Sequence, residues 1–339
     1  MLRRDLLLQL GLLATLPIAC KRDDAGTATS GATSARKLRI AVVPKGTTHE
    51  FWKAVHAGAA KAAKELEVEI IWKGPLKEDD LKSQADLVQS FTAQGVAGLV
   101  LAPLNESALA APVKAAVKSG VPVVIFDSDL KGSEHVSFVA TDNRAAGRLA
   151  GEKLGQLLGG KGNVVVLRYQ EGSASTHHRE EGFLEAIRKF ADIKLVSANQ
   201  YGGATTESAF SASENLLLAQ NAGRGQLQGV FCPNESTTFG MLLALEKAGL
   251  AGKLRFIGFD SSAKLIEGVR TGKLDGLVLQ NPFNMGYLAV KTLTRHLRKE
   301  KVEARIDTGA SLIDKANMDQ PDMKALLSPP LAEWLGSAP

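Results

Sequence analysis

From residue 37 onward, short apolar runs alternate with longer segments that carry apolar residues at helical spacing. Such runs, separated by helical segments, predict parallel strands joined by crossover helices. Five runs occupy residues 37–43, 69–72, 98–101, 121–126 and 136–139, and five more occupy residues 163–167, 194–198, 229–231, 256–259 and 277–279. This rhythm predicts an α/β fold built from doubly wound parallel sheets.

Three of the later runs each lead into a polar side chain that can form hydrogen bonds. Asn234, Asp260 and Gln280 stand at these strand ends. In open parallel sheets, ligands bind in the crevice beyond the carboxyl ends of the strands. We therefore expect the three side chains to converge on one small polar molecule.

The first half of the chain offers a matching wall. Asp127 ends a predicted strand, and Phe51 and Trp52 begin a helix just after a strand-end loop. Adjacent aromatic rings at that place could stack on the C–H face of a sugar, or either ring could pack in the core instead. Lys45 and His49 lie in the same loop and could also face the crevice, whereas His49 has no neighbour at metal-ligand spacing.

Arg179 is the most attractive ligand residue of the second half. Its planar guanidinium can donate several hydrogen bonds to hydroxyl oxygens or to a carboxylate. An ion pair with the neighbouring Glu180 or Glu181 is the alternative. The preceding pair, residues 177–178, is expected at the rim of the site and not in a catalytic role.

The order of the runs predicts two lobes that are each discontinuous in sequence. We expect the chain to cross between them near residues 142–143, 281–283 and 309–311, which gives a three-segment hinge. The predicted N-terminal lobe comprises residues 37–141 plus 281–310, the C-terminal lobe comprises residues 142–280 plus 311–318, and residues 319–339 form a C-terminal extension.

Composition agrees with a soluble two-domain protein. The chain has 339 residues, of which 45% are apolar and 23% are charged, enough for two ordinary cores. The net charge of +5 comes from scattered lysines and arginines. The short basic run at residues 295–301 is typical of a solvated helix face, so nucleic acid is not an expected partner.

The first 20 residues have the pattern of an export signal. Arg3 and Arg4 precede an apolar run at residues 6–18, which is too short to span a bilayer alone. Cys20 ends a stretch that resembles a lipoprotein box, so it is a candidate lipidation site; the alternative is an ordinary cleaved signal. The paired arginines also resemble a twin-arginine signal, so this route and the general secretory route both stay open.

Residues 21–36 are rich in Ser, Thr, Gly and Ala and predict a flexible tether. Cys232 is the only other cysteine, and we expect it to be a buried small apolar side chain without a disulfide partner. We therefore expect the protein in the periplasm or on the outer face of the cytoplasmic membrane, with Cys20 as the candidate lipid anchor.

The sequence contains no convincing catalytic or cofactor motif. Residues 155–162 approach the phosphate-loop pattern, but Gly162 stands where Ser or Thr must be, and the segment follows a helix instead of a strand. Asp127 and Asp260 could form an acid–base pair, yet the neutral donors expected around them suit the gripping of hydroxyls. We expect no enzyme activity, no cofactor and no metal site.

Several motifs together resemble one family. They are HEFW at 49–52, PVVIFD at 122–127, TDNRAAGRLAG at 141–151, REEGF at 179–183, IGFD at 257–260 and LQNP at 279–282. In this order they resemble the type 1 periplasmic substrate-binding proteins of sugar ABC transporters, in the ribose-binding protein group. The resemblance covers residues 37–317 and implies two hinged lobes of the predicted kind.

The resemblance also implies a ligand set. It places the aromatic clamp and the polar groups on Phe51, Trp52, Asp127, Arg179, Asn234, Asp260 and Gln280. The chain departs from the ribose receptors at pocket positions 45, 49, 102, 128 and 203. We keep Lys45, His49 and Ser128 as candidate ligand residues, but the sugar itself is not implied, and Lys45 could favour an acidic or phosphorylated ligand.

The resemblance implies a monomeric receptor that closes on a sugar or sugar-like ligand and delivers it to ABC permease subunits. A sensory receptor that feeds a histidine kinase or a chemoreceptor is the alternative. A repressor of the same core fold would need a helix-turn-helix at the N-terminus, where the export signal stands.

Overall fold

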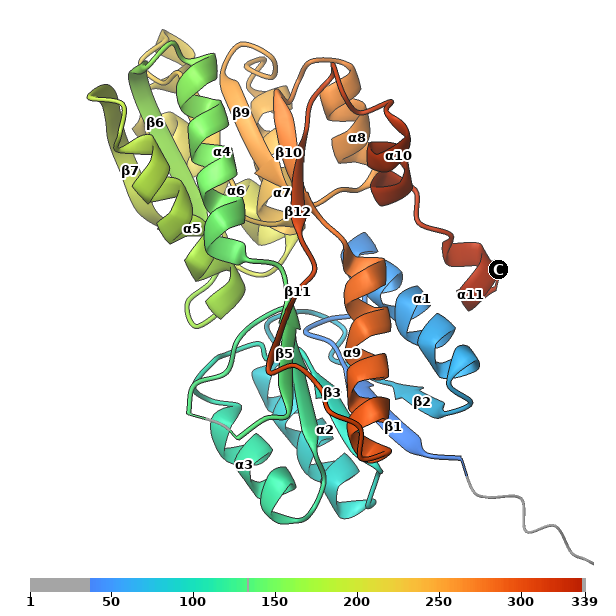
Figure 1. Cartoon of the computed structure of the whole chain (residues 1–339). Helices are drawn as coiled ribbons and strands as arrows, with labels where there is room; N and C mark the ends of the chain where they lie inside the picture. Colours follow the sequence, from blue (N-terminus) through green and yellow to red (C-terminus); the bar gives the residue numbers. More distant parts are fainter. Residues whose placement is uncertain (1–36, 133, 337–339) are drawn as a thin grey trace, which may run out of the picture. The chain divides into compact units, whose positions relative to one another are not determined.

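The computed structural model describes residues 37–132 and 134–336. The expectations for the export signal, for lipidation of Cys20 and for the tether concern residues 1–36, which lie outside this described part, as do the last three residues of the C-terminal extension. Within it, Figure 1 shows two sheets with helices on both faces of each. The expected fold class, two doubly wound lobes with a three-segment hinge, is confirmed.

The first sheet is six-stranded and parallel throughout, in the order β11-β5-β4-β3-β1-β2. Its inner strands are apolar on both faces, as strands covered by two helical layers must be. The strands are β1 (Arg39–Val43), β2 (Glu69–Trp72), β3 (Gly98–Leu101), β4 (Val123–Phe126), β5 (Ser137–Ala140) and β11 (Arg305–Asp307).

The second sheet is also six-stranded and has the equivalent order β12-β10-β9-β8-β6-β7. Its edge strand β12 runs antiparallel to β10, which departs from the expected all-parallel sheet. β12 follows β11 of the first sheet across a crossing of only two residues. The strands are β6 (Lys161–Arg168), β7 (Asp192–Tyr201), β8 (Gly229–Phe231), β9 (Arg255–Phe259), β10 (Gly276–Gln280) and β12 (Ala310–Ile313).

Helices cover both sheets, and no described helix is long and apolar enough to cross a membrane. The first sheet is covered by α1 (Glu50–Glu65), α2 (Leu81–Ala93), α3 (Ala110–Lys118) and α9 (Pro282–Leu297). The second is covered by α4 (Asn143–Leu157), α5 (Ala174–Ile187), α6 (Thr206–Ala219), α7 (Glu235–Lys247) and α8 (Ala263–Arg270). The remaining helices are η1 (Ala222–Arg224), α10 (Pro321–Leu327) and α11 (Leu331–Leu335).

The helix after β3 begins late. α3 begins at Ala110, and the residues just before it form a turn. The side chain of Asn105 accepts hydrogen bonds from the backbone N–H groups of Ser107 and Ala108. Such local side-chain bonds hold the backbone in a turn and compete with the first helical turn.

The chain passes between the sheets after β5, after β10 and after β11. The crossings are tied to one another, because Asp307 Oδ1 accepts from the backbone N–H groups of Asp142 and Gly309 at 3.1 and 2.9 Å. Thr141 Oγ1 also donates to the carbonyl of Gly309. These bonds join the crossing after β5 to the crossing after β11, although Asp142 and Asp307 are 165 residues apart in the chain.

Glycines bring the helix that carries Arg179 close to its neighbour. A Cβ on Gly147 of α4 would lie 2.0 Å from the carbonyl oxygen of Arg179 in α5. The same close approach occurs in the first lobe, where a Cβ on Gly58 would lie 1.8 Å from the carbonyl oxygen of Phe283. Since no side chain fits at these contacts, the glycines set how closely α5, which carries Arg179, approaches α4, and how closely α9 approaches α1.

Candidate functional site

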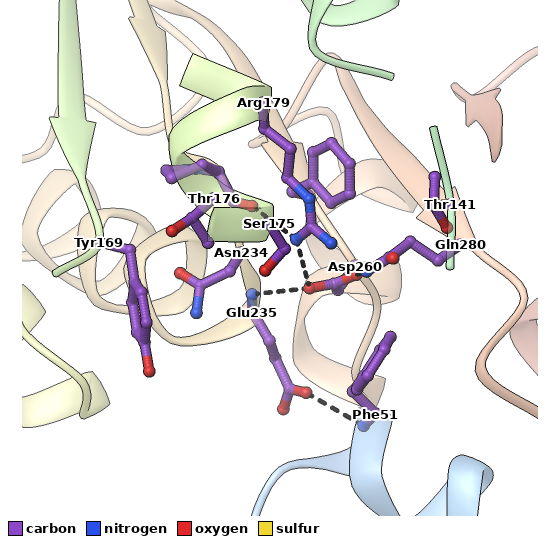
Figure 2. A network of polar contacts seen from close by, with 12 residues as sticks. Phe51, Thr141, Tyr169, Ser175, Thr176, Arg179, Asn234, Glu235, Asp260 and Gln280 are labelled. Carbon is purple, nitrogen blue, oxygen red and sulfur yellow. Dashed lines mark hydrogen bonds and ion pairs between the residues drawn. The ribbon is translucent and has the colours of Figure 1, made fainter. Parts of the chain in front are cut away.

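A cavity lies where the carboxyl ends of the two sheets face each other. It is lined by every candidate ligand residue except Ser128, and by five residues that were not predicted. Figure 2 shows side chains from both lobes converging on this place. The lining residues are Lys45, His49, Phe51, Trp52, Glu78, Asp127, Tyr169, Ser175, Thr176, Arg179, Asn234, Glu235, Asp260 and Gln280.

The two aromatic residues serve the core and the cavity together. Phe51 and Trp52 are 8% and 3% exposed, belong to the core of the first lobe and also line the cavity. Their rings meet edge to face at 4.9 Å, and Trp52 meets Phe126 in the same way. This packing holds the ring of Phe51 in a fixed orientation at the cavity wall.

Lys45 reaches across the cavity. Its ammonium lies 2.9 Å from Asp127 Oδ2 and donates hydrogen bonds to the hydroxyls of Ser175 and Ser173 in the other lobe. Apart from this ion pair, Asp127 Oδ2 has no hydrogen-bond partner, so this oxygen keeps the capacity to accept one. The three donors of the ammonium are thus directed at groups of the protein itself.

Arg179 is buried and does not pair with Glu180 or Glu181, so the alternative ion pair is not what the structure shows. Its Nε donates to Asn143 Oδ1 at 2.7 Å and its Nη1 donates to the carbonyl of Pro233 at 3.0 Å. The guanidinium also lies over the ring of Phe259 and 3.8 Å from Asp260 Oδ2.

The polar trio expected from the strand ends does converge. Gln280 donates to Asp260 Oδ1 at 2.8 Å. The side chain of Asn234 caps α7 by accepting from the backbone N–H of Thr237, so part of its hydrogen-bonding capacity is structural. Burial raises the pKa of Asp260, although Arg179 and Gln280 counteract it.

The two strand-end aspartates share an unusual backbone. Asp127 and Asp260 adopt φ angles of 60° and 63°. These values lie in the left-handed region, which residues other than glycine rarely adopt. They follow β4 and β9, which occupy the same place in the two sheets. Strained conformations of this kind concentrate at functional sites, where the surrounding structure holds them.

Glu78 is a buried hub that was not predicted from the sequence. Its carboxylate accepts from Trp52 Nε1 at 2.6 Å, contacts His49 Nδ1 at 2.7 Å and accepts from the Tyr169 hydroxyl of the other lobe. Burial alone would raise the pKa of Glu78, but the charges of His49 and Lys45 lower it to about 2. Burial likewise opposes the charged form of His49, but Glu78 raises the pKa of His49 to about 9.

Glu235 links the lobes on the opposite side of the cavity. Its carboxylate lies at the N-terminus of α1, where it accepts from the backbone N–H groups of Glu50 and Phe51 at 3.4 and 3.3 Å. Burial is the main cause that raises the pKa of Glu235 to about 7. The carboxylate therefore changes charge near neutral pH while it bridges the two lobes.

Two of the five unpredicted lining residues obey a rule that the sequence already offered. Tyr169 directly follows β6, and Glu78 lies in the loop after β2. Applying the strand-end rule to every strand would have found both of them. Ser128 lies behind the lining, where its hydroxyl accepts from the backbone N–H of Ser175.

Among the described residues, four buried polar side-chain atoms lack a hydrogen-bond partner, and three of them belong to this cavity. They are the acceptor Asp127 Oδ2, the donor Arg179 Nη2 and the acceptor Gln280 Oε1. Buried polar atoms are almost always paired. Such a concentration marks a place built to receive donors and acceptors from another molecule.

The described residues contain no cluster of three or more side chains that could hold a metal ion. The cavity is about 30 Å³, which is room for about one or two water molecules. A sugar ring therefore needs the lobes to part before it can enter. Cys232 is buried at the end of β8, as expected.

Comparison with known proteins decides the family. Residues 40–301 match the family model described as periplasmic binding protein domain. The chain belongs to the periplasmic binding protein family. Its relatives include the ribose import binding protein of Haemophilus influenzae, which is 30% identical over 86% of this chain and 96% of the relative. The sequence-derived assignment to sugar receptors of the ribose-binding group is thus confirmed.

Solved structures of similar receptors carry sugars. A solute-binding protein from Agrobacterium radiobacter in complex with D-arabinose is 33% identical, with a TM-score of 0.83 over 87% of this chain and 100% of that chain. Another from Agrobacterium vitis with bound D-fucose is 36% identical, with a TM-score of 0.81 over 86% of this chain and 100% of that chain. Both are solute-binding proteins of transporters.

Proposed function

We propose that this protein is an extracytoplasmic receptor that captures a neutral sugar between its two lobes and delivers it to an ABC importer. The observation that carries the proposal is the set of three buried polar atoms that lack a hydrogen-bond partner in the cavity that Phe51 also lines; one of them, Asp127 Oδ2, is ion-paired with Lys45. An apolar ring face beside two acceptors and one donor matches a pyranose, which presents a C–H face and several hydroxyls.

The charges of the cavity favour a neutral ligand. Lys45 is paired with Asp127, His49 with Glu78, and Arg179 faces Asp260. An acidic or phosphorylated ligand would have to displace one of these carboxylates, at the cost of leaving a buried charge without its partner. Hydroxyls can instead accept from Arg179 and donate to Asp127 without changing the charge balance.

Closure would complete the site. Lys45, Glu78 and Glu235 each make hydrogen bonds or ion pairs across the gap between the lobes. Parting the lobes at the hinge breaks these bonds and admits the ligand, and closing them surrounds it. Hydrogen bonds to charged groups contribute about 1.5–3 kcal/mol each, so a sugar that lacks one matching hydroxyl is rejected by a similar amount.

A thermal-shift screen tests the ligand class. The panel holds D-arabinose, D-fucose, D-allose and D-ribose, with D-galacturonate and ribose 5-phosphate as charged competitors. A neutral sugar present at about 100 times its Kd should stabilise the folded protein by about 2.7 kcal/mol. Preferential stabilisation by a charged sugar would contradict the neutral class, and no stabilisation by any sugar would contradict the receptor role.

Asp260→Asn tests the proposed site. The amide keeps the shape of the side chain but removes the charged acceptor, so the binding free energy should fall by about 1.5–3 kcal/mol in calorimetry. Asp86→Asn is the matched control, because Asp86 is an exposed residue of α2 remote from the cavity. Equal affinity of both variants would remove Asp260 from the site.

Binding without reaction is part of the proposal. The polar groups of the cavity are tied to one another and to the backbone, so they suit the holding of hydroxyls. NMR of the sugar after prolonged incubation with the protein should show the unchanged compound, and a new product would reveal an enzyme.

Delivery to permease subunits is tested in cells. Deleting the gene should abolish uptake of the radiolabelled sugar at low concentration, with uptake restored by the wild-type gene and not by the Asp260→Asn gene. Normal uptake, together with loss of a transcriptional or chemotactic response to the sugar, would assign the receptor to sensing instead.

Anchoring and oligomeric state complete the proposal. We expect the wild-type protein in the membrane fraction with a lipid on Cys20, and the Cys20→Ser protein in the soluble periplasmic fraction. Light scattering after size-exclusion chromatography should give the mass of a monomer with and without sugar. Release of the wild-type protein into the soluble fraction would contradict lipidation and support the alternative, an ordinary cleaved signal.

A further inference from the structure

A second cavity adjoins the sugar cavity and is about ten times larger, at about 300 Å³ against about 30 Å³. It is enclosed by the start of α1, the loop between β9 and α8, the end of β10 and the C-terminal segment at residues 326–331. Its size suits a ring or a short alkyl chain, which a small-molecule site of this volume can hold.

The two cavities share a wall. Phe51, Asp260 and Gln280 line both of them. Gln280 is 3% exposed, and its Oε1 is one of the unpartnered acceptors. A ligand gripped by Asp260 and Gln280 in the sugar cavity therefore lies directly beside the second cavity.

The lining of the second cavity differs from that of the first. Apart from the shared wall, its polar members are mainly Glu50 and a few serines, whereas the sugar cavity is lined mostly by charged and hydrogen-bonding groups. Nine of the sixteen lining residues are aliphatic, among them Ile266, Leu279, Leu326, Leu327, Pro329 and Leu331. A mainly aliphatic wall with few polar groups favours an apolar group over a second hydroxyl-rich ring.

The outer wall is held in place from both lobes. Met323, Leu326 and Leu327 of α10 pack against the core of the second lobe. Trp334 of α11 lies under the ammonium groups of Lys61 and Lys64 on α1 of the first lobe. Figure 1 shows α10 beside α8 and α11 beside α1. Because both ends are seated, residues 328–330 between them form a fixed cover over the cavity.

We propose that this second cavity is an accessory subsite that receives the small apolar aglycone of a glycoside whose sugar occupies the first cavity. This proposal rests on the proposed function, because the sugar cavity must first bind the sugar. It extends the substrate class from free monosaccharides to alkyl and aryl glycosides, with the C-terminal segment as part of the recognition surface.

Calorimetry with matched ligands tests the subsite. The probes are D-fucose and D-arabinose, their methyl and phenyl pyranosides in both anomeric forms, and lactose as a two-sugar ligand. One anomer of a phenyl glycoside should bind at least about tenfold more tightly than its methyl counterpart, as burial of one aromatic ring provides. Equal affinities, or a gain for lactose instead, would overturn the subsite while free-sugar binding leaves the proposed function standing. If no probe binds, both proposals fall.

Variants that fill the second cavity test whether the phenyl group of the glycoside binds there. Ile266→Trp and Leu327→Trp each place a larger side chain in the second cavity, so each should remove the tenfold gain of the phenyl glycoside and leave the Kd of the free sugar unchanged. Leu218→Trp is the matched control, because Leu218 is 79% exposed on α6. Having two filling variants keeps the test decisive if one of them fails to fold. A phenyl gain that persists in a folded filling variant would place the aglycone elsewhere.

Discussion

The two lobes have the same strand order but equip the cavity differently. In the first lobe, the segment after β1 contributes the ring of Phe51 and the ammonium of Lys45. In the second lobe, the segment after the equivalent strand β6 contributes Arg179 and the hydroxyls of Ser175 and Thr176. One lobe thus offers an apolar face and the other offers directional hydrogen bonds, which together suit the two kinds of surface on a sugar.

The equivalent aspartates sharpen the comparison. Asp127 and Asp260 have the same backbone conformation, and each faces a cation from the segment after the first strand of its lobe. The two cations differ in the lobe that supplies their hydrogen-bond partners. Arg179 is bonded within its own lobe, whereas Lys45 is bonded to serines of the other lobe. Arg179 is therefore part of a preformed wall, and Lys45 is part of the closure.

The largest effects should come from removing these cations. Arg179→Met leaves Asp260 buried without its partner and should lower the free energy of unfolding by about 3–5 kcal/mol in denaturant titrations. Lys45→Met should weaken sugar binding by more than it weakens the sugar-free fold, because opening of the lobes lets water reach Asp127. Lys82→Met, at an exposed pair on α2, is the control. Equal losses of stability for both cation variants would contradict the assignment of Arg179 to a preformed wall and of Lys45 to closure of the lobes.

Substitution of the glycines at the two close helix–helix contacts should give the next largest effect, one in each lobe. Gly147→Ala and Gly58→Ala each force a helix pair apart and should destabilise the protein by about 1–3 kcal/mol. Only Gly147→Ala displaces Arg179 directly. Gly223→Ala should be neutral in the same melts, because no atom lies near the position of its added methyl group. Unchanged melting temperatures would show that the helices adjust without cost.

Tyr169→Phe tests a single bond between the lobes. It removes the hydrogen bond to the buried carboxylate of Glu78 and should weaken sugar binding by about 1.5–3 kcal/mol. Tyr287→Phe is a matched control, because its hydroxyl donates to Glu65 at an exposed site within one lobe. Calorimetry should find unchanged affinity for the control, and a similar loss in both variants would exclude a special role for the link between the lobes.

The smallest effect concerns pH. Glu235 has its pKa raised to about 7 from 4.5, so the folded state binds more protons than the unfolded chain between these values, and stability falls as pH rises through 7. The raised pKa of His49 adds a fall between about 6.5 and 9, and the lowered pKa of Glu78 adds a fall below about 4.5 toward 2. Stability should therefore be greatest near about pH 4.5, where the gain from Glu78 is complete and the losses from Glu235 and His49 have not yet set in.

Glu235→Gln isolates its share of this pH dependence. Between pH 6 and 8, the fall in the free energy of unfolding should be about 1 kcal/mol smaller in the variant than in the wild type. Denaturant titrations at the two pH values measure the difference. An identical fall in both proteins would assign the pH dependence to His49 alone.

The local pattern of apolar and polar residues was enough to predict the strands and several of the polar residues at their ends. Asp127, Asp260 and Gln280 were found because parallel strands must place their carboxyl ends at one edge. Tyr169 and Glu78 obey the same rule but follow strands that the search for polar ends did not include. Glu235 was hidden, because nothing near it in sequence shows that its carboxylate caps α1 of the other lobe.

By itself, the sequence determined the alternation of strands and helices, the two lobes with three crossings, and most of the side chains that line the cavity, because each follows from local periodicity. Only the tertiary structure decided the direction of β12, the pairing of Lys45 with Asp127 and the seating of residues 321–335 on both lobes. These features join segments that are distant in the chain, and their partners are chosen by packing and charge across the closed cleft.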